Sequence, residues 1–514
     1  MIESRNAVQH YLDRHLIEGR TDRPAIITQA ETLTYGDLLD RVERSAGALH
    51  EAGVEAGDRV LVVLPDCVDA ISFILGAMRL GAVPVPLHVR LSDQEYRLIY
   101  DDCRPAAAVV STEHLDRLSR FSPNIHLSTD LFVLGDGDGR AIPVREALSS
   151  AARREFVDCD PDAPALLQYT SGSTGAPKGV VHRHAALLAL PAGFATYLEL
   201  SREDLCFSAA KLFFGYGLGN SLFFPFDAGA AVLLREEASD PVGILREVST
   251  ARPTVFFGSP GLYTAILALM SPHSAFDLSS VRLFISAGEA LAPRVFERWE
   301  ERFSRRIVDG LGSTECLHIF AASRPRDAAA GRIGPPVPGC EVRVVGDDGA
   351  PVLTGTAGVA EVQGLAVSRR YWARPEETTK TMVDGWVRTG DVVRPHADGS
   401  FEFIGREDDL FKVRGSKVAP LEIETRLKEH PAVADSAVVP CADRWGLQVS
   451  RAVICLEAEW EPSAELEREL RRFLLAVLPK HKVPRVVDFA RTLPRTSTGK
   501  LARRRILEGQ VELI

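Results

Sequence analysis

The chain lacks the cysteine patterns that mark metal sites and disulfide frameworks. Its eight cysteines are scattered, with no C-x-x-C pair, which favours a reducing compartment over an oxidising one. No apolar run approaches the roughly 20 residues of a membrane-spanning helix, and the first residues lack the charged-then-apolar pattern of a signal peptide. Low-complexity tracts and obvious repeats are missing too. These absences predict a cytoplasmic protein without membrane insertion.

Basic residues are too few for a typical nucleic-acid-binding protein. The sequence has 60 Lys and Arg against 70 Asp and Glu, a formal net charge of −10, which argues against nucleic acid as the main partner. Its 514 residues, 46% of them hydrophobic, exceed what one hydrophobic core accommodates. We therefore expect two or more domains, in a monomer or a homodimer.

Hydrophobic strands alternate with helices along the first part of the chain. A helix is expected to begin at Leu33 and end near Gly53. Residues 59–65 and 82–87 then have the composition of buried strands, and residues 68–80 between them have that of a helix. The alternation predicts an α/β fold with layered, largely parallel sheets.

The texture of the sequence changes twice further along. The strand–helix alternation returns from residue 166 to about 320, whereas short alternating strands between Gly/Asp turns over 339–404 predict a small β-barrel or sheet. A smaller α+β segment follows the charged stretch 406–409, the expected linker. The expected organisation is an N-terminal domain over 1–405, with α/β subdomains at about 1–165 and 166–335 and a β subdomain at about 336–405, and a mobile C-terminal domain over 406–514.

The most informative segment is the glycine- and hydroxyl-rich stretch 169–180. Its glycines let successive backbone N–H groups face one anion, and its hydroxyls and lysine add donors and charge. The G-x-x-x-x-G-K-[ST] spacing of the P-loop is absent. A mobile Gly/Ser turn is the alternative, but the length of the pattern favours a phosphate-binding loop. Its candidate ligands are Thr170, Ser171, Ser173, Thr174 and Lys178.

Six further segments occur in a fixed order along the chain. They are Phe-Phe-Gly-Tyr-Gly at 213–217, Ser-Ala-Gly-Glu-Ala at 286–290, Asp-Gly-Leu-Gly-Ser-Thr-Glu at 309–315, Trp-Val-Arg-Thr-Gly-Asp at 386–391, Gly-Arg-Glu-Asp-Asp-Leu-Phe-Lys-Val-Arg-Gly at 405–415 and Pro-Arg-Thr-Ser-Thr-Gly-Lys at 494–500. With the loop, this ordered set resembles the adenylate-forming superfamily of acyl-CoA synthetases, peptide-synthetase adenylation domains and luciferases. Segments 211–220 and 312–320 are similar to the benzoate-CoA ligase group.

The resemblance implies a two-step reaction. A carboxylate attacks the α-phosphate of MgATP to give an acyl-adenylate and pyrophosphate, and the thiol of coenzyme A then displaces AMP. Such transfer depends on positioning and charge neutralisation more than on covalent help from the protein. The implied cofactors are ATP, Mg²⁺ and coenzyme A, and an acyl carrier protein is the alternative thiol donor.

The same resemblance assigns roles to the nucleotide motifs. The hydroxyls and lysine of the loop would hold the β- and γ-phosphates, Thr314 the α-phosphate and Glu315 the Mg²⁺. For Glu315 the alternative is an ordinary acidic residue at a helix start. Asp391 and Arg406 resemble the two ribose contacts, although Asp391 alone is more often a turn residue. The adenine pocket would be lined by Gly288, Glu289, Asp309, Gly310 and Leu311, the last standing where many relatives have tyrosine.

Lys500 resembles the catalytic lysine of adenylation, whose ammonium would bridge the substrate carboxylate and the α-phosphate. A basic C-terminal tail is the alternative. Asp408 resembles the hinge about which the C-terminal domain turns, with a solvated acidic turn as the alternative. Lys412 and Gly415 would border the pantetheine tunnel. The intact Lys500, Glu315 and Asp391 argue against a catalytically inactive adenylate binder, and the pocket motifs argue against a luciferase-type oxygenase.

The aryl pocket follows from the two segments shared with the benzoate-CoA ligase group. Its implied lining is Phe214, Gly215, Tyr216, Gly217, His318 and Ile319, which as isolated residues would more often be core. Benzoate-specific relatives tend to have alanine at the position of Gly215, so the missing methyl predicts room beside the ring. We expect a substituted benzoate as the small aromatic acid, with 2-aminobenzoate ahead of hydroxybenzoates and benzoate.

Overall fold

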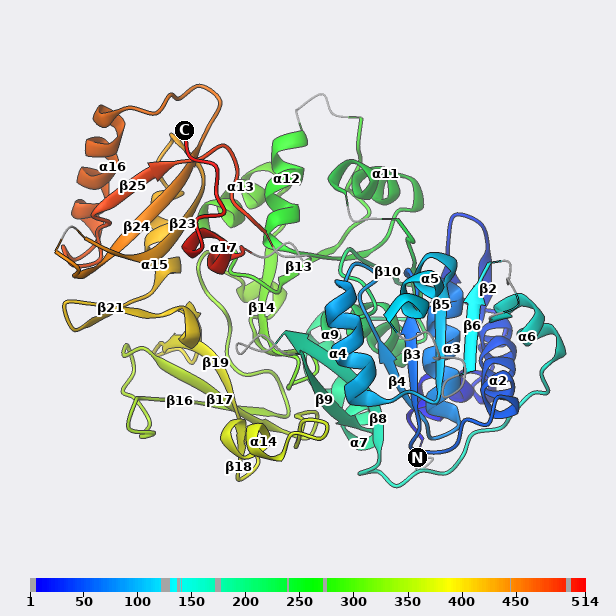
Figure 1. The fold of residues 1–514 in the computed structure, drawn as a ribbon. Coiled ribbons are helices and arrows are strands. Elements are labelled where there is room, and N and C mark those ends of the chain that lie inside the picture. The colour runs from blue at the N-terminus through cyan, green and yellow to red at the C-terminus, as the bar shows by residue number, and fades with distance from the viewer. Residues whose placement is uncertain are drawn as a thin grey trace. The chain divides into compact units, whose positions relative to one another are not determined.

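The computed structural model describes residues 6–121, 130–135, 139, 141–171, 177–237, 240–270, 275–443, 445–495 and 501–514. They form two compact units (Figure 1). The first comprises residues 1–343, 361–389 and 398–400, and the second comprises 344–360, 390–397 and 401–514. Each unit contains hydrophobic cores of its own.

An eight-stranded sheet in the first unit has the order β15-β14-β13-β12-β10-β11-β1-β2. Its inner strands pair in parallel, whereas β15 and β2 pair antiparallel at the two edges. The strands are β1 (Pro24–Ile27), β2 (Thr32–Thr34), β10 (Leu205–Ser208), β11 (Ala231–Leu233), β12 (Val255–Gly258), β13 (Leu283–Ala287), β14 (Ile307–Gly312) and β15 (Ile319–Ala322). The predicted α/β fold with parallel sheets is confirmed.

Both faces of this sheet are covered, so its inner strands are hydrophobic on successive residues. Phe256 and Phe284 face a core that contains Trp299 of α13, whereas Phe257 and Ile285 belong to the core on the opposite face. The helices on the Trp299 side are α11 (Pro241–Ala251), α12 (Pro260–Leu269) and α13 (Pro293–Phe303), which pack side by side (Figure 1).

A second sheet in the first unit has five parallel strands in the order β4-β3-β5-β6-β7. Val60 and Val62 of β3 face one core, and Leu61 and Val63 face another. Its strands are β3 (Arg59–Val63), β4 (Val83–Pro86), β5 (Ala107–Ser111), β6 (Asp130–Leu134) and β7 (Ile142–Pro143). The helices that cover it are α2 (Tyr35–Glu51), α3 (Val68–Arg79) and α6 (Val144–Ser150) on one face, and α4 (Asp93–Cys103) and α5 (Thr112–Phe121) on the other.

Helix α2 begins two residues later than the sequence predicts. Thr32–Thr34 pairs with β1 as strand β2, so Leu33 is not helical. Thr34 then caps the helix: its hydroxyl accepts from the Asp37 backbone N–H at 3.1 Å, and the Asp37 carboxylate accepts from the Thr34 N–H at 3.0 Å. This reciprocal pair satisfies backbone donors that the first helical turn leaves open.

Two further sheets precede residue 407. A hairpin joins β8 (Pro164–Ser171) to β9 (Pro177–Arg183). The region predicted to form a small β-barrel or sheet forms a sheet in the order β16-β17-β19-β18, with β20 paired to β19. Its strands are β16 (Cys340–Val345), β17 (Gly358–Gly364), β18 (Met382–Val383), β19 (Trp386–Pro395) and β20 (Phe401–Arg406).

The C-terminal part of the second unit is an α+β structure. Ile423 of α15, Leu470 of α16 and Ile454 of β24 share its main core. A hairpin precedes it, whose turn residues Arg414 and Gly415 both have positive φ, 51° and 82°. The elements are β21 (Phe411–Val413), β22 (Ser416–Val418), α15 (Pro420–Leu427), β23 (Val433–Ala442), β24 (Gln448–Leu456), α16 (Ala464–Val477), β25 (Val486–Phe489) and α17 (Arg503–Leu507).

Short helical segments connect these elements. They are η1 (Gln9–Asp13), α1 (Arg14–Ile17), α7 (His184–Ala189), η3 (Leu190–Ala192), α8 (Ala195–Leu198), α9 (Gly215–Leu218), η4 (Gly219–Phe223), α10 (Phe224–Ala228), η5 (Pro325–Asp327), α14 (Pro375–Thr381) and η6 (Glu407–Asp409). Within the described ranges, no helix is both long and apolar enough to cross a membrane.

Candidate active site

Three loops that carry predicted site residues leave the same edge of the eight-stranded sheet. Phe214 follows β10, Gly288 follows β13 and Thr314 follows β14. Strand β12 lies between β10 and β13, and β14 is the next neighbour, all paired in parallel. Since parallel strands present their carboxyl ends at one edge, and ligands of open α/β sheets bind there, the topology brings these loops to a common site.

The adenine candidates lie on β14 and just beyond β13. Ser286 pairs with Asp309 and Ala287 with Gly310, so Gly288 and Glu289 emerge beside β14. Gly288 has φ +94°, a conformation that side chains disfavour, and both Gly288 and Glu289 are exposed. Burial raises the pKa of Asp309 to about 7. Leu311, the residue in place of the usual tyrosine, is half-buried.

The turn after β14 places Thr314 and Glu315. The Leu317 N–H donates to the Thr314 carbonyl at 3.0 Å, and Leu317 itself has φ +67°, which is uncommon for a residue with a side chain. The Glu315 carboxylate is half-buried, and its Oε1 accepts from the Tyr371 hydroxyl at 2.7 Å. The turn thus holds the predicted magnesium ligand in one orientation.

The predicted phosphate loop joins β8 and β9. Thr170 pairs with Lys178 across this hairpin, and Ser171 ends β8. Ser173 and Thr174 lie outside the described residues. The Lys178 ammonium nitrogen is 5.7 Å from the centroid of the Tyr371 ring, within cation–π range. Tyr371 therefore contacts residues of two predicted nucleotide motifs.

Glycines allow the 215–219 helical segment to lie directly against the turn after β14. A Cβ on Gly215 would come within 2.3 Å of the Leu317 carbonyl oxygen, and one on Gly219 within 2.3 Å of the His318 ring. The expectation that Gly215 opens room beside the aryl ring is therefore wrong, because backbone of the 314–318 turn occupies that space. Gly217 likewise lies against the Lys211 carbonyl oxygen, at 2.0 Å from its would-be Cβ, and its place in the aryl pocket stays a prediction.

His318 is the centre of an aromatic cluster. Its ring centroid lies 4.6 Å from Phe224, 5.3 Å from Tyr216 and 5.9 Å from Phe194. Burial lowers the pKa of His318 to about 3, so the imidazole is neutral at pH 7. Its Nε2 lies 3.1 Å from the Asn220 amide oxygen, and in the tautomer that this contact favours Nε2 donates the hydrogen. Nδ1 is then a buried acceptor without a well-formed hydrogen bond among the described residues, and the ring also interacts with the Tyr216 backbone, which favours its protonated form.

The remaining aryl-pocket candidates have different surroundings. The Tyr216 hydroxyl lies 3.3 Å from the carbonyl oxygens of Gly258, the last residue of β12, and Ile285, in the middle of β13. Phe214 contacts Phe213, with ring centroids 4.3 Å apart. Ile319 is buried, and its side chain fills the space beside Gly310 of β14. Ile319 therefore packs under the predicted adenine strand.

Two buried polar residues near the pocket escaped the sequence analysis. Gln168 of β8 is 1% exposed, its amide atoms have no hydrogen bond within the described ranges, and its Oε1 lies 3.1 Å from the would-be Cβ of Gly215. Asp66 accepts from the Leu212 N–H at 3.0 Å and lies 3.8 Å from the Lys211 ammonium. Burial raises the pKa of Asp66 to about 6. A polar residue inside or just after a hydrophobic strand was the available signal for both.

The two ribose candidates are cross-strand neighbours in the second unit. Asp391 of β19 pairs in register with Arg406 of β20, and the Arg406 guanidinium donates to the Asp391 carboxylate at 2.7 Å. Asp391 is 4% exposed, whereas the Arg406 side chain is about half exposed. A residue buried on one strand is thus joined to an exposed cation on the next.

The hinge and pantetheine candidates lie on the surface of the second unit. Asp408 is an exposed residue of the single turn η6, Lys412 is exposed on β21, and Gly415 is in the β21–β22 turn. Lys500 lies outside the described residues. The assigned roles of these four residues stay predictions.

Two protein-family models match this chain. Residues 13–372 match the AMP-binding enzyme model, and residues 422–500 match the model of the AMP-binding enzyme C-terminal domain. The chain belongs to the AMP-binding enzyme family. The resemblance drawn from its ordered motifs is confirmed.

Relatives of this AMP-binding enzyme are similar over nearly their whole length. It is 36% identical to the benzoate–CoA ligase of Thauera aromatica, over 98% of this chain and 95% of that protein. It is 35% identical to the anthranilate–CoA ligase of Pseudomonas aeruginosa, over 91% of both chains. The crystal structure of the anthranilate CoA ligase AuaEII with anthranoyl-AMP matches with a TM-score of 0.92 at 32% identity, covering 99% of this chain and 98% of that one.

The close approach at Gly215 predicts the effect of adding a methyl. Gly215→Ala should lower the free energy of unfolding by about 1–3 kcal/mol, since the Leu317 carbonyl must move. Urea denaturation measures this. The control is Gly261→Ala in α12, where a Cβ meets nothing within 4 Å. A variant as stable as wild type that loses only 2-aminobenzoate turnover would restore the idea of an open space at this position.

The raised pKa of Asp309 predicts a pH-dependent stability. The folded-state pKa of about 7 lies above the ordinary value of 3.8, so the folded state retains a proton that the unfolded state releases, and stability falls as pH rises between these values. Asp309→Asn should therefore gain stability over wild type between pH 5 and pH 8, by about 1–3 kcal/mol. Denaturation at both pH values measures it; a difference independent of pH contradicts the prediction.

Proposed function

We propose that this chain is an AMP-forming aryl-CoA ligase that converts 2-aminobenzoate to its CoA thioester, with hydroxybenzoates and benzoate as poorer substrates. The family and the similarity to benzoate– and anthranilate–CoA ligases support an aromatic acid as substrate. The preference for 2-aminobenzoate rests on a different observation, the hydrogen-bonding state of His318.

The Nδ1 atom of His318, which lacks a well-formed hydrogen bond among the described residues, supports this preference. It is a neutral acceptor, buried among Tyr216, Phe194 and Phe224, in a part of the chain whose residues the motifs assign to the aryl pocket. An amino or hydroxyl group on the substrate ring donates to such an atom, whereas an unsubstituted ring leaves it without a partner. A buried polar atom left unpaired costs about 1–3 kcal/mol, which is roughly 5–150-fold in kcat/KM.

Glu315 fits the magnesium that ATP brings. Mg²⁺ is usually held by one or two carboxylates together with substrate phosphates and water. Among the described residues no group of three or more His, Cys, Asp or Glu side chains could enclose a metal ion, so the single carboxylate of Glu315 suits an ion already carried by phosphates. When bound, Mg²⁺ would neutralise charge on these phosphates, while Lys178 adds a second positive group.

The two half-reactions require different groups. In this proposal Lys500 stabilises the charge that develops during adenylation, and a turn about Asp408 then brings Lys412 and Gly415 to the thiol of CoA. Asp391 and Arg406 hold the ribose in both steps. The organisation into a 1–405 and a 406–514 domain belongs to the same proposal.

The ratio of kcat/KM for 2-aminobenzoate and benzoate tests the substrate. With MgATP and CoA, we expect thioester formation to favour 2-aminobenzoate by about fivefold or more. His318→Phe keeps a flat ring without the acceptor, so the ratio should fall toward one while benzoate turnover persists. A wild-type ratio well below one would make benzoate the substrate, and steady pyrophosphate release without thioester would indicate a carrier protein as acceptor.

Lys500→Ala separates the half-reactions. Loss of a charge that acts only in the adenylation transition state should lower pyrophosphate formation by about 100–1,000-fold. Conversion of a synthetic aryl-adenylate and CoA to thioester should continue at nearly the wild-type rate. Equal losses in the two assays would contradict the assigned role. Lys480→Ala, a lysine elsewhere in the second unit, serves as the control.

A further inference from the structure

Tyr371 contacts two residues that the nucleotide motifs single out. Its hydroxyl donates to Glu315 Oε1 at 2.7 Å, although the two residues are 56 positions apart. The face of its ring lies 5.7 Å from the Lys178 ammonium nitrogen. Tyr371 is 6% exposed, so both contacts are shielded from water and retain more of their strength than surface contacts do.

The backbone on either side of Tyr371 is tied to β9. The Val181 N–H donates to the Arg370 carbonyl at 3.2 Å, and the Trp372 N–H donates to the Gly179 carbonyl at 2.7 Å. Tyr371 itself bridges Val180. The tyrosine thus lies along β9, the strand that contains the predicted phosphate-binding residue Lys178.

Ser368 ties the same segment to both β9 and the β14 turn. Its N–H donates to the Glu315 carbonyl at 2.7 Å, and its hydroxyl donates to the Val181 carbonyl at 2.8 Å. The segment therefore holds Glu315 at two points, the backbone through Ser368 and the carboxylate through Tyr371.

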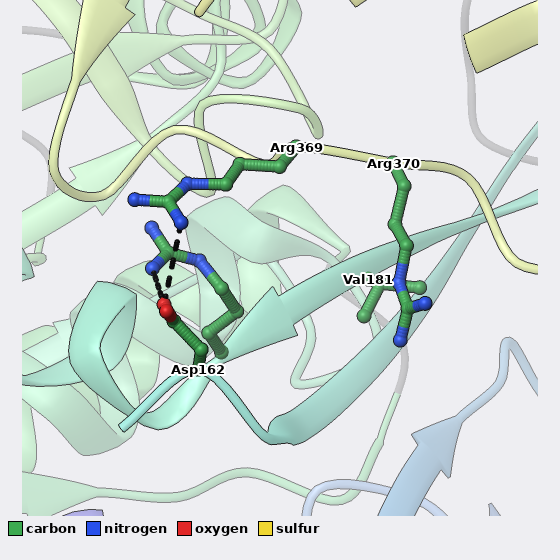
Figure 2. A pocket seen from close by; sticks show the side chains of 5 residues that line it. Asp162, Val181, Arg369 and Arg370 are labelled. Atoms are coloured by element: carbon green, nitrogen blue, oxygen red, sulfur yellow. Dashed lines mark hydrogen bonds and ion pairs between the residues drawn. The ribbon is translucent and has the colours of Figure 1, made fainter. Parts of the chain in front are cut away.

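The residues just before Tyr371 line a surface pocket together with Asp162 and the end of β9. Figure 2 shows Asp162 against the Arg369 side chain, with Arg370 on the other side of Val181. Asp162 accepts from Arg183, which ends β9, and from Arg369 at 3.4 Å. The Asp162 carboxylate thus pairs with two arginines and links the 365–370 segment to the end of β9.

We propose that Tyr371 is a positioning residue for magnesium–ATP binding: it holds Glu315 Oε1 and so turns Oε2 of the same carboxylate toward the ion. No hydrogen bond to Oε2 is made within the described ranges, whereas Oε1 is engaged by Tyr371. The ring also contacts the Lys178 ammonium, which is predicted to bind the phosphates. The inference rests on the proposed role of Glu315, and it extends that role to a residue outside every motif of the sequence analysis.

Equilibrium binding of ATP at increasing Mg²⁺, without any aromatic acid, tests the proposal. Groups that orient a metal ligand typically contribute 10–100-fold to metal affinity. Tyr371→Phe keeps the ring and removes the hydroxyl, so the Mg²⁺ concentration that half-maximally supports ATP binding should rise about 10–100-fold. The matched control is Tyr35→Phe, another buried tyrosine, whose hydroxyl donates to the Ala230 carbonyl at 2.8 Å; it should leave the Mg²⁺ dependence unchanged.

A double-mutant cycle separates positioning from a general structural effect. In a Glu315→Gln background, Tyr371→Phe should weaken Mg²⁺-dependent ATP binding no further. An unchanged Mg²⁺ dependence in Tyr371→Phe alone, or equal losses in both backgrounds, would overturn the inference. If wild type binds MgATP normally but forms no aryl thioester, the proposed function fails and this inference stands. If wild type shows no Mg²⁺-dependent ATP binding, the role of Glu315 fails and both fall.

Discussion

The parallel pairing of β10, β12, β13 and β14 is the constraint on which the site depends. Parallel strands need helical crossovers, and those helices bury both faces of the sheet. Polar groups that can bind a ligand are then found mainly at the ends of the strands, so ligands of such sheets bind beyond the carboxyl ends. In this chain the register places Gly288, Asp309 and Thr314 on neighbouring strands or just beyond them. The candidates that follow β10, β13 and β14 therefore share one edge although their sequence positions differ widely.

Close backbone packing refines this edge. Gly215 and Gly219 are four residues apart, so they lie on one face of a helical segment. Each packs directly against the turn after β14, at a place where a methyl group would collide with that turn. Leu317, with its positive φ, turns the chain so that its carbonyl meets Gly215 and the next side chain meets Gly219. The positive φ of Leu317 and the absence of side chains at Gly215 and Gly219 together allow this close packing. A buried, neutral His318 packed against Gly219 is the result.

Much of the fold was predictable from local pattern. Alternating hydrophobic strands and amphipathic helices predicted the α/β class, and the change of texture after residue 339 predicted a separate small sheet. Errors arose where tertiary pairing outweighed local preference. Leu33 belongs to an edge strand because β1 offers it a partner, whereas its own sequence context favours a helix start. The missing methyl of Gly215 was predicted to leave room for the substrate, but the Leu317 carbonyl, from a turn about 100 residues later, fills that space.

The sequence by itself determined the family and the order of the nucleotide motifs, because these residues must have particular chemistry at particular spacing to bind phosphate, ribose and metal. Only the tertiary structure decided which atoms are satisfied. Asp391 and Arg406 meet because the register of β19 and β20 places them opposite each other. Tyr371 meets Glu315 because its segment, which carries no motif, hydrogen-bonds along β9 and reaches the turn after β14. Such contacts leave no local signature, since a hydrogen bond between distant residues depends on where the packed sheet and its hairpin bring them, not on their neighbours in the chain.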